Sequence, residues 1–274
     1  EKAGIDNFTF ADLIFPAFLL MVGVSIPLGL GKRIERNEPL KKSLGHIFSR
    51  TAALLVMGVV LVEPWAFDPV ATGMPAYFWF PLFYIGAALF LVDTKPFQWI
   101  ESRPRLKKWL KGGGLYIVAV LLLISQFDYQ DGMGPGPIRT SWWGILGKIG
   151  WCYLPNALIW NAVARQRKRM RTESSLLDTF FAVFVLELTL YILWHAELLP
   201  FLNNSFINIP VLFGSHAAIV TAGMIAGQMI VEKKSTKKLI INWVLFGAII
   251  YGLGTALRPW QIANKIEGTA SWCM

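Results

Sequence analysis

Six ionisable side chains stand within or at the ends of long apolar runs in this sequence. An ionisable group at the centre of a membrane span costs roughly 2.5–3.5 kcal/mol on insertion scales, so each one needs a structural or chemical reason. Five of the six lie in the half of their run that the loop charges, described below, assign to the outer side. This shared depth predicts one polar cavity that opens outward. The six residues are Asp12, Lys148, Glu187, His195, His216 and Arg258.

Three of these residues have a structural explanation beside the chemical one. Asp12 could cap the start of the first apolar helix, because its carboxylate can accept from the N–H groups that lack partners there. Lys148 could extend its ammonium to the interface or form an ion pair with Glu187. Glu187, in the middle of its run, could join two helices. For each of the three, both the structural role and a role in the site stay open.

The other three are two histidines and an arginine near the ends of their runs. His195 and Arg258 could be interfacial side chains without chemistry, and Arg258 is followed by Pro259 and Trp260. His216 lies in Gly-Ser-His-Ala-Ala, where small neighbours leave room around the imidazole. We therefore keep all three as candidates for the outward cavity.

No metal or cofactor motif accompanies these residues. The two cysteines, Cys152 and Cys273, have neither metal-ligand spacing nor the pattern of a disulfide framework. A P-loop, a His-Glu-x-x-His pair and a Gly-x-Ser-x-Gly motif are missing from the sequence. We predict no metal site.

The elements that must position these residues are apolar helices. The 274 residues are 55% hydrophobic and 16% charged, whereas globular domains carry about 25% charge. A run of about 20 apolar residues is long enough to cross a bilayer. We predict an all-α polytopic transmembrane bundle of about eight spans that forms a single transmembrane domain over residues 1–274. The apolar segments are 10–30, 46–62, 75–92, 115–127, 142–164, 176–195, 211–231 and 239–257.

Two of these segments carry further detail. The fourth is short for a span, so Gly112–Gly114 or Ser125–Phe127 must extend it. The seventh carries small residues at four-residue spacing, which favours close packing against another helix. These residues are Gly214, Ala218, Gly223 and Gly227.

Basic residues alternate between the loops and set the orientation. Five Lys or Arg lie in residues 31–45, six in 93–114, five in 165–175 and four in 232–238. The intervening loops 63–74, 128–141, 196–210 and 258–271 carry only Arg139, Arg258 and Lys265. This positive-inside pattern predicts a multi-pass membrane protein surrounded by the lipid bilayer, with both ends of the chain outside. If the source is bacterial, the membrane is the cytoplasmic membrane and the ends lie in the periplasm.

The same division of charge argues against nucleic acid as a partner, despite the net charge of +9. A nucleic-acid site would need the basic residues on one contiguous face. The oligomeric state stays open, including a homodimer. The chain begins with Glu1 rather than Met and stops after a polar loop, so we expect a fragment of a longer protein.

Four segments resemble the heparan-α-glucosaminide N-acetyltransferase family of transmembrane acetyltransferases, and more closely its bacterial relatives of undetermined substrate. The resemblance covers essentially the whole chain, and its first and last segments are the most specific. The segments are Phe8-Thr-Phe-Ala-Asp-Leu-Ile-Phe-Pro-Ala-Phe-Leu-Leu-Met-Val-Gly-Val-Ser-Ile-Pro-Leu, Arg50-Thr-Ala-Ala-Leu-Leu-Val-Met-Gly-Val, Ser141-Trp-Trp-Gly-Ile-Leu-Gly-Lys-Ile-Gly-Trp-Cys-Tyr-Leu and Leu257-Arg-Pro-Trp-Gln-Ile-Ala-Asn-Lys-Ile-Glu-Gly-Thr-Ala-Ser-Trp.

The resemblance implies transfer of an acetyl group from cytosolic acetyl-CoA to an amino sugar across the membrane. The family uses a His in the outer loop before its Asp-Leu-Val/Ile-Phe-Pro motif, with the motif's Asp beside it. Asp12 matches that Asp, whereas Lys2 stands about ten residues earlier, where the His is expected. His216 or His195 could stand in as the base, with a carboxylate to orient it.

On this basis we predict Asp12 and His216 as catalytic residues. We predict Lys148, Glu187, His195 and Arg258 as contacts of a sugar or glycan acceptor. Acetyl-CoA is the implied acyl donor, and basic inner loops suit its phosphates, although such loops also mark topology in any membrane protein. The alternatives are a transporter or binding protein for a sugar or lipid-linked glycan, and an inactive family member.

Overall fold

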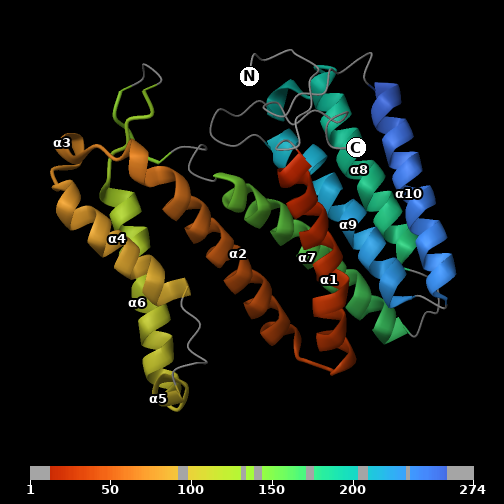
Figure 1. Cartoon of the computed structure of the whole chain (residues 1–274), viewed down its shortest axis with the longest axis horizontal. Helices are drawn as coiled ribbons and strands as arrows, with labels where there is room; N and C mark the ends of the chain where they lie inside the picture. Colours follow the sequence, from red (N-terminus) through yellow and green to blue (C-terminus); the bar gives the residue numbers. More distant parts are fainter. Residues whose placement is uncertain are drawn as a thin grey trace. The chain divides into compact units, whose positions relative to one another are not determined.

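The computed structural model describes residues 13–91, 98–130, 134–138, 144–170, 176–202, 209–232 and 235–257. Throughout these residues the regular elements are helices, so the all-α prediction is confirmed (Figure 1). In chain order they are α1 (Ile14–Glu35), α2 (Leu40–Val62), η2 (Glu63–Ala66), α3 (Pro69–Thr72), α4 (Ala76–Leu91), α5 (Gln98–Glu101), α6 (Pro104–Ile124), α7 (Gly144–Met170), α8 (Leu177–His195), η4 (Pro200–Leu202), the π-helix η5 (Val211–Ser215), α9 (His216–Val231) and α10 (Thr236–Leu257).

Each predicted apolar segment coincides with one long helix, the seventh being η5 and α9 together. Five helical segments of the described residues are long and apolar enough to cross a membrane: Ile14–Glu35, Leu40–Leu61, Leu177–His195, Val211–Val231 and Thr236–Ala256. The chain is therefore a multi-pass membrane protein. Eight spans with both ends outside stay a prediction.

Several helices extend further into the basic segments than predicted. Helix α6 starts at Pro104 and includes Gly112–Gly114, so the fourth segment gains its length from the N-terminal side, and Ser125 ends the helix. Helix α7 continues to Met170 through Arg167, Lys168 and Arg169. Lys and Arg are good helix formers, and cations at a helix C-terminus interact favourably with its dipole. Loop boundaries drawn from charge alone were therefore too wide.

The chain divides into two compact units, Arg50–Gly150 and the combination of Glu1–Ser49 with Trp151–Met274. We call them the α4–α6 unit and the α9 unit. Helices α2 and α7 each contribute residues to both. The single transmembrane domain of the sequence analysis stays a prediction.

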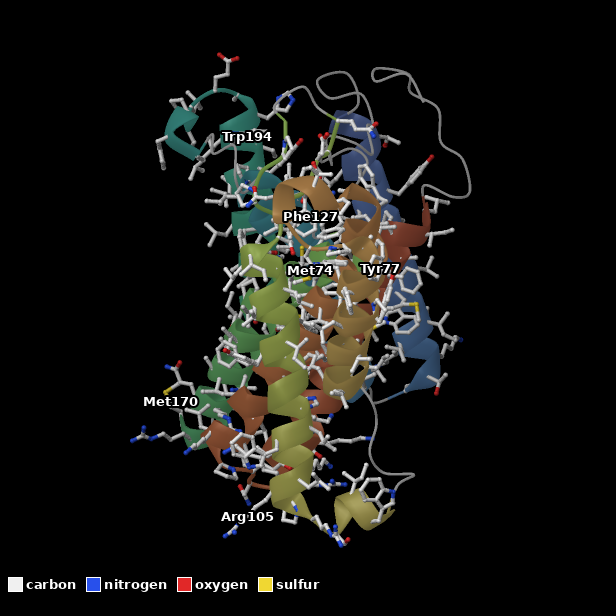
Figure 2. All side chains as sticks on the ribbon, turned by 90° about the vertical axis from the view of Figure 1, so that its left-hand side faces the viewer. Met74, Tyr77, Arg105, Phe127, Met170 and Trp194 are labelled. Carbon is white, nitrogen blue, oxygen red and sulfur yellow. The ribbon has the colours of Figure 1, made fainter. Side chains whose placement is uncertain are left out.

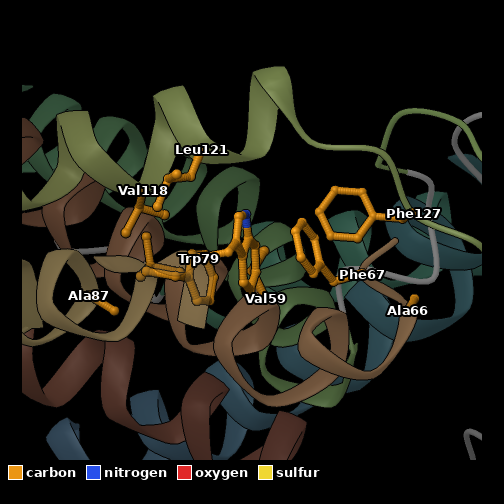
Figure 3. Packing of buried hydrophobic residues seen from close by; sticks show 10 residues of the cluster. Val59, Ala66, Phe67, Trp79, Ala87, Val118, Leu121 and Phe127 are labelled. Atoms are coloured by element: carbon orange, nitrogen blue, oxygen red, sulfur yellow. The ribbon is translucent and has the colours of Figure 1, made fainter. Parts of the chain in front are cut away.

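An aromatic stack fills the core of the α4–α6 unit (Figure 3). The Trp79 ring stacks on Phe67 at 4.4 Å and on Phe83 at 4.6 Å between ring centroids. Its Nε1 donates to Ser125 Oγ over 2.7 Å, so the indole is satisfied within the core. Figure 2 shows Arg105 at one end of this unit and Phe127 at the other. The basic segment that contains Arg105 thus lies at the opposite end of the unit from Phe127, as the alternating loop charges predict.

Helix α9 is the centre of the α9 unit. In an 18-residue stretch of the span Val211–Val231, 89% of the residues are buried inside the protein, against 6% in a stretch of equal length within Thr236–Ala256 of α10. Gly23 of α1 faces Gly223 of α9 so closely that a Cβ on Gly23 would collide with the Val220 carbonyl oxygen. A Cβ on Gly227 would lie 2.6 Å from Val24 O. The close helix packing predicted from the small residues is confirmed.

We predict that Gly23→Ala destabilises the protein, because the added methyl group meets backbone rather than a flexible side chain. Overpacking of this kind costs about 1–3 kcal/mol. Thermal unfolding of the purified protein in one detergent measures the effect.

Gly29→Ala is the matched control, because Gly29 lies in the same helix and a Cβ there meets nothing within 4 Å. This variant should equal or slightly exceed the wild type, since Ala favours helix over Gly. Equal melting temperatures for the two variants would contradict the α1–α9 contact.

Candidate functional site

A network of polar side chains joins three helices inside the α9 unit. Thr221 Oγ1 of α9 lies 2.6 Å from Glu187 Oε2 of α8 and 2.8 Å from Asn156 Oδ1 of α7. Asn156 Nδ2 donates to the carbonyl oxygens of Cys152 at 3.1 Å and Ala217 at 3.4 Å. We call this the Glu187–Thr221–Asn156 network. It links α7, α8 and α9 where no side chain reaches water, since Asn156 and Thr221 are fully buried and Glu187 is 9% exposed.

The backbone that leads into α9, the helix that carries Thr221, is a π-helix. Residues Val211–Ser215 form η5 directly before α9. Cys152 Sγ donates to the Leu212 carbonyl oxygen over 3.3 Å, which satisfies one of the carbonyls in the widened turn. A Cβ on Gly214 would lie 2.9 Å from Tyr191 Cβ, so glycine permits the close approach of η5 and α8. Single π turns inside helices occur frequently at functional sites.

His216 follows this turn and is the most deeply buried of the predicted site residues that the structure describes, at 2% exposed. Its imidazole contacts the Phe15 ring edge-on, with 5.1 Å between ring centroids. Phe15 belongs to the first turn of α1 and comes three residues after Asp12 in the sequence. Asp12 itself lies outside the described residues.

The remaining predicted residues have different surroundings in the structure. His195 is the exposed last residue of α8, with its ring 6.1 Å from Tyr191 and 6.5 Å from Trp194 between centroids. Lys148 is partly exposed in the first turns of α7 and belongs to the α4–α6 unit. Arg258 lies outside the described residues. Of the four candidates that the structure describes, Glu187 and His216 are both buried in the α9 unit.

Glu187 has the interhelical role that the sequence left open. It contacts Thr221 of α9 and Asn156 of α7 and makes no ion pair within the described part of the chain. The described residues hold no group of three or more His, Cys, Asp or Glu that could bind a metal ion.

The search for ionisable groups missed Asn156 and Thr221. Both are neutral and stand in apolar stretches, Tyr-Leu-Pro-Asn-Ala-Leu-Ile and Ala-Ile-Val-Thr-Ala-Gly-Met. Buried amides and hydroxyls require hydrogen bonds in a membrane just as charges require partners. The side-chain amide of Asn156 in the middle of an apolar run was the sequence feature that could have identified it as a buried hydrogen-bonding residue.

We expect Asn156→Leu to lower the melting temperature, because Leu fills the space without supplying a partner for Thr221 or the Ala217 carbonyl. Leaving a buried polar group unsatisfied costs about 1–3 kcal/mol. Ala162→Leu is the control, since Ala162 is exposed on the same helix. A melting temperature of Asn156→Leu within the error of this control would show that the network contributes no stability.

An apolar cavity of about 560 Å³ lies on another side of α9, between α1, α8 and α10. Its lining residues are uncharged and include Leu20, Leu188, Ala222 and Phe246. Helix α10 is held here by two contacts: Trp243 Nε1 donates to Ala226 O over 3.3 Å, and Phe246 packs edge-on against Phe181 at 5.8 Å. The cavity suits a hydrocarbon chain, and no Lys or Arg lines it.

Basic residues at the end of α7 hold the turn between α1 and α2. Lys168 Nζ donates to the Ile34 carbonyl over 2.6 Å and to Asn37 Oδ1 over 2.9 Å. Arg165 Nη1 donates to the Glu38 carbonyl over 2.9 Å. Asn37 has φ +56°, a left-handed conformation that Asn tolerates at a helix end. Part of the inner basic charge thus has a structural role, which weakens its use as an indication of CoA binding.

Glu38 completes this turn through ion pairs with Arg33 at 2.9 Å and Lys42 at 3.2 Å. Desolvation alone would raise the pKa of the Glu38 carboxyl, but the hydrogen bonds from Lys42 and Arg33 outweigh it and lower the pKa below its ordinary value of 4.5. A lowered pKa in the folded state stabilises the fold above the ordinary pKa, and this stabilisation is lost as the pH falls through the lowered value.

We therefore expect Glu38→Gln to be less stable than the wild type at neutral pH, and this difference in stability should shrink as the pH falls below 4.5. Melting temperatures measured from neutral to acid pH check this. Glu35→Gln is the control, because the exposed Glu35 side chain makes no ion pair among the described residues. If the stability difference between the wild type and Glu38→Gln grew toward acid pH, it would contradict the stabilising ion pairs of Glu38 with Arg33 and Lys42.

The chain is similar to a curated protein over part of its length. It is 37% identical over 59 residues to the heparan-alpha-glucosaminide N-acetyltransferase of Mus musculus. The match covers 22% of this chain and 9% of the mouse protein, so the chain spans only a small part of the relative. No protein-family model matches the chain. No solved structure matches it either. The similarity supports a relationship with a membrane acetyltransferase for this part of the chain.

Proposed function

We propose that this chain is the transmembrane core of an acyltransferase of a bacterial cytoplasmic membrane. It transfers an acetyl group from cytosolic acetyl-CoA to an amine or hydroxyl of a sugar or glycan on the outer face. The observation that carries the proposal is the contact of His216 with Phe15, because Phe15 follows Asp12 by three residues. The partial similarity to a membrane acetyltransferase supports the choice of reaction.

In the proposed reaction His216 is the general base. Its imidazole takes the proton from the acceptor N–H or O–H while the nitrogen or oxygen bonds to the acetyl carbon. The C–S bond of the thioester then breaks, and CoA leaves as a thiolate that is protonated afterwards. Asp12 orients the imidazole and balances its positive charge. Lys148, His195 and Arg258 are proposed acceptor contacts, and Glu187 supports the helix that carries His216.

A second candidate is a transporter or binding protein for a lipid-linked glycan. The apolar cavity beside α9 favours it, because that cavity suits a hydrocarbon chain and no cation that could hold CoA phosphates lines it. The two candidates differ in their dependence on an acyl-CoA.

The test is acetyl transfer by the full-length protein in proteoliposomes. Radiolabelled acetyl-CoA is supplied on the side of the basic loops, and a panel of amino sugars and cell-wall glycans on the other side. We expect labelled sugar, and a loss of about 100-fold or more in His216→Ala and Asp12→Asn, since general base catalysis contributes about 10²–10⁴-fold.

His195→Ala is the comparison, because it removes a proposed acceptor contact and leaves the proposed base in place. It should raise the KM for the acceptor and keep kcat within about twofold of the wild type, since a lost binding contact changes KM rather than the chemical step. Loss of kcat in His195→Ala with full activity in His216→Ala would move the base to His195. No label on any acceptor would contradict the acyltransferase and favour the glycan transporter.

A further inference from the structure

The Glu187–Thr221–Asn156 network has a hydrogen-bond balance that depends on one proton. Thr221 has a single hydroxyl hydrogen, yet its oxygen lies within hydrogen-bond distance of two acceptor oxygens, at 2.6 Å from Glu187 and 2.8 Å from Asn156. One hydroxyl can donate to only one of them. The other contact therefore needs a hydrogen from the partner side.

Asn156 cannot supply that hydrogen. Its Nδ2 donates to the carbonyl oxygens of Cys152 and Ala217, and this fixes which side of the amide faces Thr221. Reversing the amide would place Oδ1 against these two carbonyl oxygens, so two repulsive contacts would replace two hydrogen bonds. The orientation of a buried amide is assigned by such networks.

Glu187 can supply it when its carboxyl group is protonated. The acid O–H then donates to Thr221 Oγ1, and the Thr221 hydroxyl donates to Asn156 Oδ1. Each of the two contacts of Thr221 Oγ1 then has one hydrogen, and these two donors run in one direction from α8 through α9 to α7. With an ionised carboxylate, two oxygens would face each other at 2.6 or 2.8 Å with no hydrogen between them.

Among the described residues, no cation forms an ion pair with Glu187 that would hold it as an ionised carboxylate. Glu187 is 9% exposed and makes no ion pair among the described residues. The titratable side chains buried on the packed helices are Tyr191 on α8 itself, Cys152 and Tyr153 on α7 and His216 on α9. A buried charge without a partner is costly, and a carboxyl group avoids that cost by keeping its proton.

We propose that Glu187 is a proton-binding site that is occupied at neutral pH, and that its proton locks α7, α8 and α9 together. Removing the proton leaves Thr221 with two acceptors and one hydrogen, so the joint between the three helices loosens as the pH rises. The proposal does not depend on acetyl transfer and would stand if the proposed function failed.

Infrared difference spectroscopy of the full-length protein in nanodiscs tests the proton directly. The wild-type minus Glu187→Gln spectrum at neutral pH should contain a carboxylic-acid C=O band that shifts in D₂O. Carboxylate bands in its place would overturn the proposal.

Melting temperatures across the pH range test the lock. Gln at position 187 supplies an N–H donor at every pH. The melting temperature of the wild type should therefore fall below that of Glu187→Gln as the pH is raised. If the melting temperature of the wild type instead rose relative to that of Glu187→Gln from acid to neutral pH, the carboxyl group would be ionised and the proposal would be overturned.

Thr221 provides a second pair of variants. Thr221→Val removes the shared hydroxyl with little change in shape and should lower the melting temperature by several degrees. Thr221→Ser keeps the hydroxyl and should remove most of that loss and restore the pH dependence. A Thr221→Val protein with wild-type stability and pH dependence would show that no lock exists.

Discussion

Helix α9 is enclosed by protein on nearly all sides, and the rest of its unit depends on how that enclosure is achieved. The glycines at 23, 223 and 227 let the backbones of α1 and α9 touch, so one side of α9 is closed without side chains. Van der Waals contact of this kind replaces the hydrophobic driving force that is lacking between helices in lipid. The first turn of α1 is thereby placed beside His216, which is the contact on which the proposed chemistry rests.

Enclosure also limits the hydrogen bonds that the buried polar residues of α9 and of its neighbour α8 can form. A hydroxyl or carboxyl group on a lipid-facing or water-facing helix can turn away from its neighbours, but Thr221 and Glu187 cannot, so their hydrogen bonds must balance within three helices. Helix α10 shows the opposite case. It is mostly exposed, meets α9 through Trp243 and leaves an apolar cavity beside it. The same unit thus combines a rigid polar centre with a loosely packed lipid-facing side.

The sequence predicted the helices well because long apolar runs are local signals, and the small residues of the seventh segment correctly indicated close packing. Helix ends were less predictable, since Lys168 and Arg169 continue a helix as readily as they mark a loop. The shared depth of five ionisable residues predicted a common cavity, but depth says nothing of which helix face a residue occupies, so the cavity stays a prediction. His216 and Glu187 lie within one unit, whereas Lys148 belongs to the other and His195 is exposed. Asn156 was missed because a neutral amide carries little weight in a search based on charge.

The network and the proposed base also constrain each other. Asn156 donates to the carbonyl of Ala217, the residue next to His216, so the hydrogen bonds that begin at Glu187 end on the backbone that carries the imidazole. On its other side His216 continues from the π-helix, whose Leu212 carbonyl is held by Cys152. The backbone is therefore held by α7 on both sides of His216, at Leu212 and at Ala217. A base on such a backbone has little freedom to move toward a substrate, so an acceptor must be brought to it. The first turn of α1, which carries Phe15 and follows Asp12 in the sequence, is a described element in contact with the imidazole, so a proposed acceptor would be brought to His216 beside this turn.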